Sequence, residues 1–75
     1  MTKLPLVDGR SVVRAFERAG WERSRQRGSH VVLTKPGSFV SLSVPMHRSV
    51  GRGLLHDLIG KAGLTDEEFI ELLKA

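Results

Sequence analysis

Residues 23–33 read RSRQRGSHVVL and decide the fold class of this 75-residue chain. Gly28-Ser29 is a typical turn pair between two extended segments, so the stretch predicts a β-hairpin. Arginine stands at every second position before the turn, and alternate side chains of a strand point to the same side. We therefore predict that Arg23, Arg25 and Arg27 project from one face of the hairpin.

A histidine begins the second strand of this hairpin. Val31 and Leu33 alternate along that strand and are predicted to face the core, which places His30 on the open face near the arginines. Imidazole gains and loses a proton near neutral pH, and guanidinium groups bind phosphates. A titrating group beside a cationic row suits phosphodiester chemistry on a polyanion. The simpler interpretations are an ordinary surface histidine and a solvated hairpin edge.

A third strand extends the hairpin into a sheet. The first two strands are predicted at residues 21–26 and 30–34. Residues 35–38 contain Pro-Gly and predict a second turn. Residues 39–44 alternate apolar side chains with serines, and Pro45 ends this third strand. Three consecutive strands joined by short turns indicate an antiparallel meander.

Apolar stripes at helical spacing predict three helices around the strands. The first helix covers residues 9–19, with Asp8 as its N-cap. The second helix is introduced by residues 51–53 and closed by Gly63. The third begins at the capping box of residues 65–68 and continues almost to the C-terminus.

The order of elements is helix, three strands, helix, helix, which indicates an α+β fold with the helices on one face of an antiparallel sheet. The length fits a single domain over residues 1–75. The sequence has no cysteine, which fits a reducing compartment. It shows no signal peptide and no transmembrane segment. We therefore expect a cytoplasmic protein without a membrane partner.

The charge is distributed unevenly along the chain. Residues 1–65 hold eleven Lys and Arg against four Asp and Glu, a net charge of +7, whereas residues 66–75 hold four acids and one lysine. Eight of the twelve cations are arginine, which can bind a phosphate with two parallel hydrogen bonds. The composition therefore favours a nucleic-acid partner, although small proteins also carry basic surfaces for solubility.

Several short motifs occur in a characteristic order over nearly the full length. They are Ala19-Gly20-Trp21, Gly28-Ser29-His30-Val31-Val32, Val44-Pro45-Met46-His47, the glycine-led helix Gly53-Leu54-Leu55-His56-Asp57-Leu58-Ile59 and the closing Ala62-Gly63-Leu64-Thr65. With these motifs the chain resembles HicA-type toxins, the RNA-cleaving partners of bacterial toxin–antitoxin pairs. The resemblance implies a fold like that of double-stranded-RNA-binding domains. It also implies the toxin of a type II pair, a metal-independent mRNA endoribonuclease without a cofactor, whose catalytic histidine corresponds to His30. A HicB-type antitoxin is expected to cover that residue.

RNA can be cleaved without a metal ion because its own 2′-hydroxyl can attack the neighbouring phosphate. The step needs a base for that hydroxyl, an acid for the departing 5′-oxygen and cations for the phosphorane. His30 suits either of the first two roles, and the sequence leaves open which. His47, after the third strand, is the better candidate for its partner, whereas His56 is expected to be a solvated helix residue.

The residues expected to bind RNA are polar or cationic and lie in or near the strands. They are Arg23, Arg25, Arg27, Ser29, Lys35 and His47. The three histidines are 17 and 9 residues apart, which matches no compact metal-ligand pattern, so we expect no metal site. The alternative functions are a non-catalytic RNA-binding module of the same fold and a small interaction protein with an incidental basic surface.

Overall fold

Six helices and strands follow one another in the computed structural model, which describes residues 3–75. They are α1 (Gly9–Arg18), β1 (Glu22–Arg27), β2 (His30–Thr34), β3 (Leu42–Pro45), α2 (Arg52–Lys61) and α3 (Asp66–Lys74). The predicted α+β order is confirmed. The strands form one antiparallel sheet in the order β1-β2-β3.

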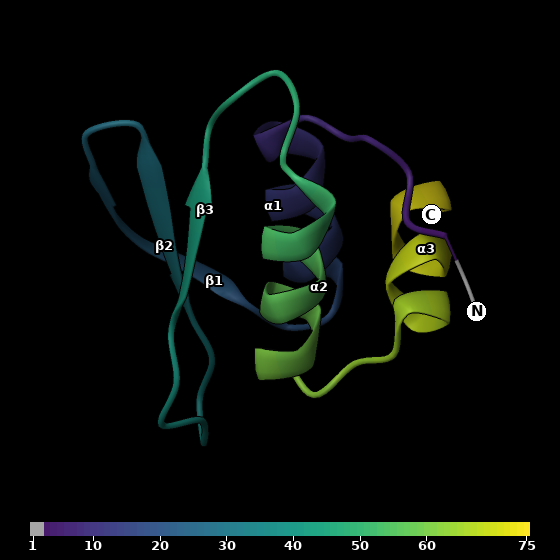
Figure 1. The fold of residues 1–75 in the computed structure, drawn as a ribbon. Helices are drawn as coiled ribbons and strands as arrows, with labels where there is room; N and C mark the ends of the chain where they lie inside the picture. Colours follow the sequence, from purple (N-terminus) through teal and green to yellow (C-terminus); the bar gives the residue numbers. More distant parts are fainter. Residues whose placement is uncertain (1–2) are drawn as a thin grey trace.

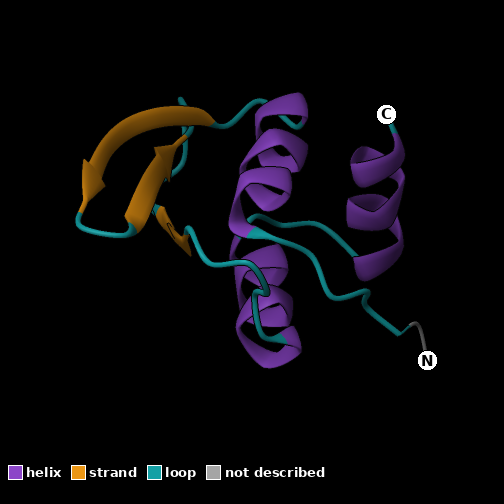
Figure 2. Ribbon diagram, turned by 90° about the horizontal axis from the view of Figure 1, so that it is seen from above, coloured by secondary structure: helices purple, strands orange, loops and turns teal. Residues whose placement is uncertain are grey.

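The elements stack in three layers (Figure 1). Helices α1 and α2 lie against one face of the sheet, and α3 packs on their far side (Figure 2). Among residues 3–75, no helix lies on the other face of the sheet. The predicted placement of the helices on one side is therefore confirmed, and one sheet face is left open to solvent.

The caps of α1 and α3 explain where these helices begin. The Asp8 carboxylate accepts hydrogen bonds from the backbone N–H of Ser11 (3.3 Å) and from its hydroxyl (2.6 Å). The Thr65 hydroxyl accepts from the Glu68 N–H, and the Glu68 carboxylate accepts from the Thr65 N–H, which completes a capping box. Both helix starts are thus specified locally by the sequence.

One apolar core joins the three layers. Leu33 and Leu42 project from the sheet and are fully buried together with Leu55 of α2. The rings of Phe16 and Phe69 meet with their centroids 5.1 Å apart, which joins α1 to α3. Burial of such side chains is the main source of stability for a domain of this size.

The third strand is shorter than its sequence pattern predicts. It begins at Leu42 rather than at residue 39, and its last partner is Leu33. β2 ends one residue beyond that pair, at Thr34, and residues 39–41 are not paired with it. Phe39 is fully exposed, and the alternation in this stretch belongs to a loop.

The segment after β3 passes closely over the start of α1. The N–H of Gly9 donates to the His47 carbonyl at 2.9 Å. A Cβ atom on Gly9 would overlap the Pro45 carbonyl oxygen and lie 2.8 Å from the Met46 Cα. The absence of a side chain at Gly9 therefore permits the approach that positions His47.

We expect Gly9→Ala to destabilise the protein by about 1–3 kcal/mol, because the added methyl group meets backbone that cannot move without loss of packing. Gly60→Ala is the matched control. Gly60 lies inside α2 with nothing within 4 Å of an added Cβ, so its replacement is expected to stabilise by about 0.5–1 kcal/mol. Urea unfolding of both variants measures the difference, and equal effects would contradict the close approach at Gly9.

Candidate active site

The hairpin turn places His30 at one end of the sheet. Gly28 has a φ of 59°, and Ser29 has a negative φ, as two-residue turns of type II′ require. Glycine adopts the first of these conformations without strain. His30 then starts the central strand, with Arg27 and Pro45 as its neighbours on the two flanking strands. Its side chain is exposed, as predicted, so the ring faces solvent.

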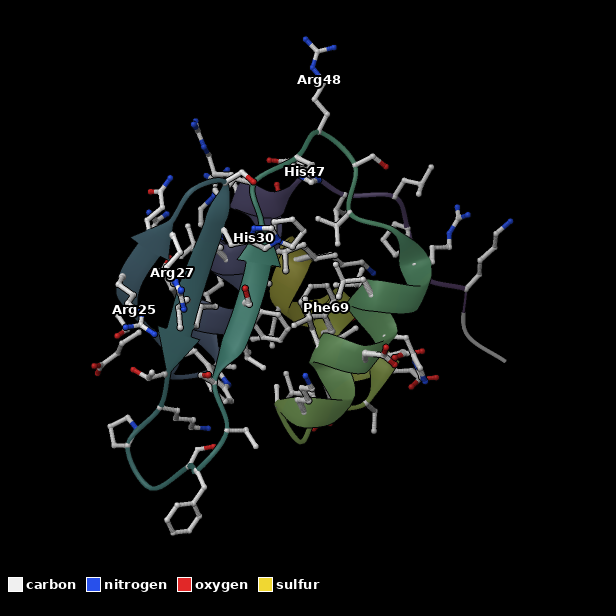
Figure 3. The ribbon with its side chains drawn as sticks, turned by 60° about the vertical axis from the view of Figure 1, so that its left-hand side comes forward. Arg25, Arg27, His30, His47, Arg48 and Phe69 are labelled. Atoms are coloured by element: carbon white, nitrogen blue, oxygen red, sulfur yellow. The ribbon has the colours of Figure 1, made fainter. Side chains whose placement is uncertain are left out.

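A second histidine, His47, lies near His30 and comes from the segment after β3. The N–H of Met46 donates to the Ser29 carbonyl at 2.7 Å, which fastens the segment after β3 to the hairpin turn. The rings of His30 and His47 consequently lie edge to face, with centroids 6.2 Å apart. Both side chains are exposed, and Figure 3 shows them together at one end of the strands. A single phosphodiester can contact both imidazoles.

Two of the three predicted arginines share the open face with His30. Residues directly opposite each other in an antiparallel pair project to the same side. Arg27 lies opposite His30, and Arg25 lies opposite Val32, both of which are open-face positions of β2. Both arginines are exposed, and Figure 3 shows them along β1. Their positive charge therefore borders the histidine pair.

The third arginine lies on the opposite face, so the prediction of one row of three is wrong. The register shifts between Arg23 and Arg25, which leaves Ser24 as the extra residue of a β-bulge. Arg23 consequently lies opposite the buried Leu33, on the helix side of the sheet. Its Nε atom is 3.7 Å from a carboxylate oxygen of Glu17 on α1. Such an exposed ion pair contributes little stability.

Lys35 and Ser29 differ in their distance from His30. Lys35 follows the opposite end of β2, five residues on, which is about 16 Å at the rise of a strand. Its ammonium group lies 6.0 Å from the centre of the Trp21 ring. The structure therefore does not bring Lys35 to the histidine pair. Ser29 stays in the turn beside His30, where its carbonyl holds the Met46 N–H.

Two arginines near the pair were missed by sequence reasoning. A surface hollow of about 240 Å³ adjoins His47 and is lined by Asp8, Arg10, Met46, His47 and Arg48. Arg10 is in the first turn of α1 and Arg48 follows β3 in the loop, so only the fold brings them together. The one signal in the sequence for this site was that Arg48 directly follows His47.

The third histidine lies apart from the other two. The Nδ1 atom of His56 on α2 is 3.2 Å from a carboxylate oxygen of Asp66 at the start of α3. In the part of the chain that the structure describes, no three His, Cys, Asp or Glu side chains are grouped as ligands of a metal ion. Residues 3–75 also contain no helix that is long and apolar enough to span a bilayer.

Comparison with known protein families identifies one match. A family model described as the HicA toxin of bacterial toxin–antitoxin systems matches residues 9–64, from the first residue of α1 to the end of the turn after α2. The matched residues include the hairpin, His30 and His47. They also include every residue that lines the hollow except Asp8. No curated protein matches the chain.

Proposed function

Because this chain belongs to the HicA family of bacterial toxins, we propose that it cleaves mRNA as the toxin of a type II toxin–antitoxin pair, acting in the cytoplasm without a metal ion. One observation carries the proposal. The exposed His30 ring lies 6.2 Å from that of His47, on the sheet face that also presents Arg25 and Arg27. The pair supplies two proton carriers, and the arginines supply positive charge for a phosphate.

The proposed reaction uses the 2′-hydroxyl of the RNA as its nucleophile. One imidazole removes the proton of that hydroxyl, and its oxygen forms a bond to the adjacent phosphorus. The bond from phosphorus to the 5′-oxygen of the next nucleotide breaks, and the other imidazole, in its protonated form, gives that oxygen a proton. The products are a 2′,3′-cyclic phosphate and a 5′-hydroxyl. Which histidine is acid and which is base stays open in this proposal.

The arginines are proposed to stabilise the charge that develops on the phosphate. The phosphorane carries more negative charge on its oxygens than the starting diester does. Guanidinium groups held beside it stabilise the transition state more than the ground state. Arg27 is the nearer of the two, since it lies directly opposite His30 in the sheet.

The proposed activity is tested by incubating the purified protein with RNA in an excess of EDTA. We expect cleavage of RNA at a rate that EDTA does not change, and no cleavage of DNA of the same sequence. Loss of activity in EDTA that Mg²⁺ restores would contradict the proposal. Salt-dependent RNA binding without any turnover would favour the non-catalytic alternative.

The open-face arginines are expected to affect RNA affinity more than Arg23 does. Arg25→Gln and Arg27→Gln should each weaken RNA binding by about tenfold, because each removes a charged group that can donate hydrogen bonds to the RNA phosphates. Arg23→Gln removes the same charge from the same strand but on the opposite face, and should change affinity less than twofold. Fluorescence anisotropy with labelled RNA measures all three. Equal losses for Arg23 and Arg27 would contradict the assignment of faces.

His47 is expected to change the pH dependence of cleavage. With one imidazole acting as base and one as acid, the rate should fall on both sides of a maximum. His47→Gln should lower the maximal rate by about a hundredfold. It should also abolish the fall in rate on one side of the maximum, that is, one of the two limbs of the pH–rate profile. The initial rate, measured from pH 5 to pH 9 under EDTA, provides the test. A variant with both limbs intact would show that His47 is not the partner.

We also propose that an antitoxin of the HicB type silences the protein by covering this face. An acidic segment laid over Arg25 and Arg27 would exclude RNA and shield His30 at once. Hydrogen exchange of the protein in complex with its HicB-type antitoxin is the test. We expect protection in residues 25–32, and full inhibition with protection only in α2 and α3 would contradict it.

A further inference from the structure

We propose that the hollow beside His47 binds the RNA phosphate that follows or precedes the scissile one, which makes Arg10 and Arg48 RNA-binding residues. This inference rests on the proposed function and extends it to a second phosphate site. The hollow has a volume of about 240 Å³, enough for a phosphate group with its water. Both guanidinium groups are exposed and can form two parallel hydrogen bonds with phosphate oxygens.

The hollow continues the line of the proposed active site. Arg27 lies beside His30, the His30 ring contacts that of His47, and His47 lines the hollow. These groups come from β1, β2, the segment after β3 and the start of α1. Figure 3 shows Arg27, His30, His47 and Arg48 successively toward one end of the molecule. An RNA strand whose scissile phosphate lies at the histidines therefore has arginines available on both sides.

The backbone of this site is fixed by hydrogen bonds at two points. The N–H of Met46 donates to Ser29, and the His47 carbonyl accepts from Gly9. The segment that carries His47 and Arg48 is thus attached to both the hairpin turn and α1. This attachment holds the hollow at a constant position relative to His30, as a subsite for a flanking phosphate requires.

One carboxylate also lines the hollow and has to be accounted for. The Ser11 hydroxyl hydrogen bond lowers the pKa of Asp8, so this side chain is negative at neutral pH. Its two oxygens already accept hydrogen bonds from Ser11. Arg10 and Arg48 together carry two positive charges against this one, so the hollow still attracts an anion. The Gly9 N–H is occupied by His47, so the site depends on side chains rather than on the helix terminus.

The test measures how RNA affinity depends on salt. An oligoribonucleotide with 2′-O-methyl groups at every position cannot be cleaved through its 2′-oxygens, so binding is observed alone. We expect Arg10→Gln/Arg48→Gln to weaken binding by about tenfold at low salt and to reduce the slope of log K against log salt by about 0.7, the loss of one phosphate contact from a single strand. Lys61→Gln/Lys74→Gln removes the same net charge from exposed helix positions outside the hollow and should leave both quantities unchanged.

The possible results separate this inference from the proposed function. Unchanged affinity and slope in Arg10→Gln/Arg48→Gln, or an equal loss in the control variant, would overturn the second phosphate site even if the wild-type protein cleaves RNA. A loss confined to Arg10→Gln/Arg48→Gln supports that site. If that loss occurs and the wild-type protein cleaves no RNA in EDTA, the nuclease proposal fails and the phosphate site remains as part of an RNA-binding surface.

Discussion

His30→Ala is expected to reduce RNA cleavage by about 10³- to 10⁴-fold, because the substitution removes one of the two proton carriers that the reaction needs. The fold should remain intact, since the imidazole is exposed and is not part of the buried core. Replacements of exposed side chains usually change stability by less than about 0.5 kcal/mol. RNA affinity should fall only slightly, as the arginines remain. The initial rate of cleavage and the urea midpoint together measure this result.

His56→Ala is the matched control for that experiment. It removes an exposed histidine of the same chemistry from α2, where its neighbour is Asp66 rather than an arginine. Activity should stay within a factor of two of wild type. If His30→Ala retains more than a tenth of the activity, or if His56→Ala loses as much, then the histidine at the hairpin turn is not the catalytic group.

Phe69→Ala is expected to destabilise the protein by about 3–5 kcal/mol, the usual range for truncation of a buried aromatic ring. Phe69 is fully buried, and its ring packs on Phe16 at 5.1 Å. It is the only fully buried residue of α3, and the partly buried Ile70, Leu72 and Leu73 pack against the core beside it. A domain of this size has about 4–11 kcal/mol of stability in total. Much of the population should therefore lose the docking of α3, or unfold.

Phe39→Ala provides the comparison for this prediction. It removes the same ring from the loop between β2 and β3, where Phe39 is fully exposed. Phe39→Ala should lower the free energy of unfolding by less than about 0.5 kcal/mol. Urea unfolding gives both values, and hydrogen exchange in α3 shows whether that helix separates first. A Phe69→Ala variant as stable as Phe39→Ala would contradict the role assigned to the contact between the two helices.

Local signals in the sequence were sufficient for the order of elements. Asp8 and the capping box at Thr65 and Glu68 specify helix starts through hydrogen bonds to residues three positions away. The Gly28-Ser29 pair specifies its turn through the backbone angles of glycine. Each of these signals acts over a few residues, and each is confirmed by the structure.

The errors occur where distant parts of the chain decide the outcome. The bulge at Ser24 depends on how β1 matches β2, and a strand of alternating arginines gives no indication of it. The bulge places Arg23 on the helix-covered face of the sheet. The late start of β3 depends on where its pairing with β2 ends. Arg10 and Arg48 are 38 positions apart and meet only because the segment after β3 crosses the start of α1.

The central claim is that the paired histidines cleave RNA by means of its own 2′-hydroxyl. The most direct measurement compares an oligoribonucleotide with a copy that has hydrogen in place of this hydroxyl at the mapped cleavage position, both in EDTA. We expect the parent to yield a fragment ending in a 2′,3′-cyclic phosphate and the modified copy to stay intact at that position. Cleavage of both molecules at similar rates would contradict the claim, because the nucleophile would then come from water or from the protein.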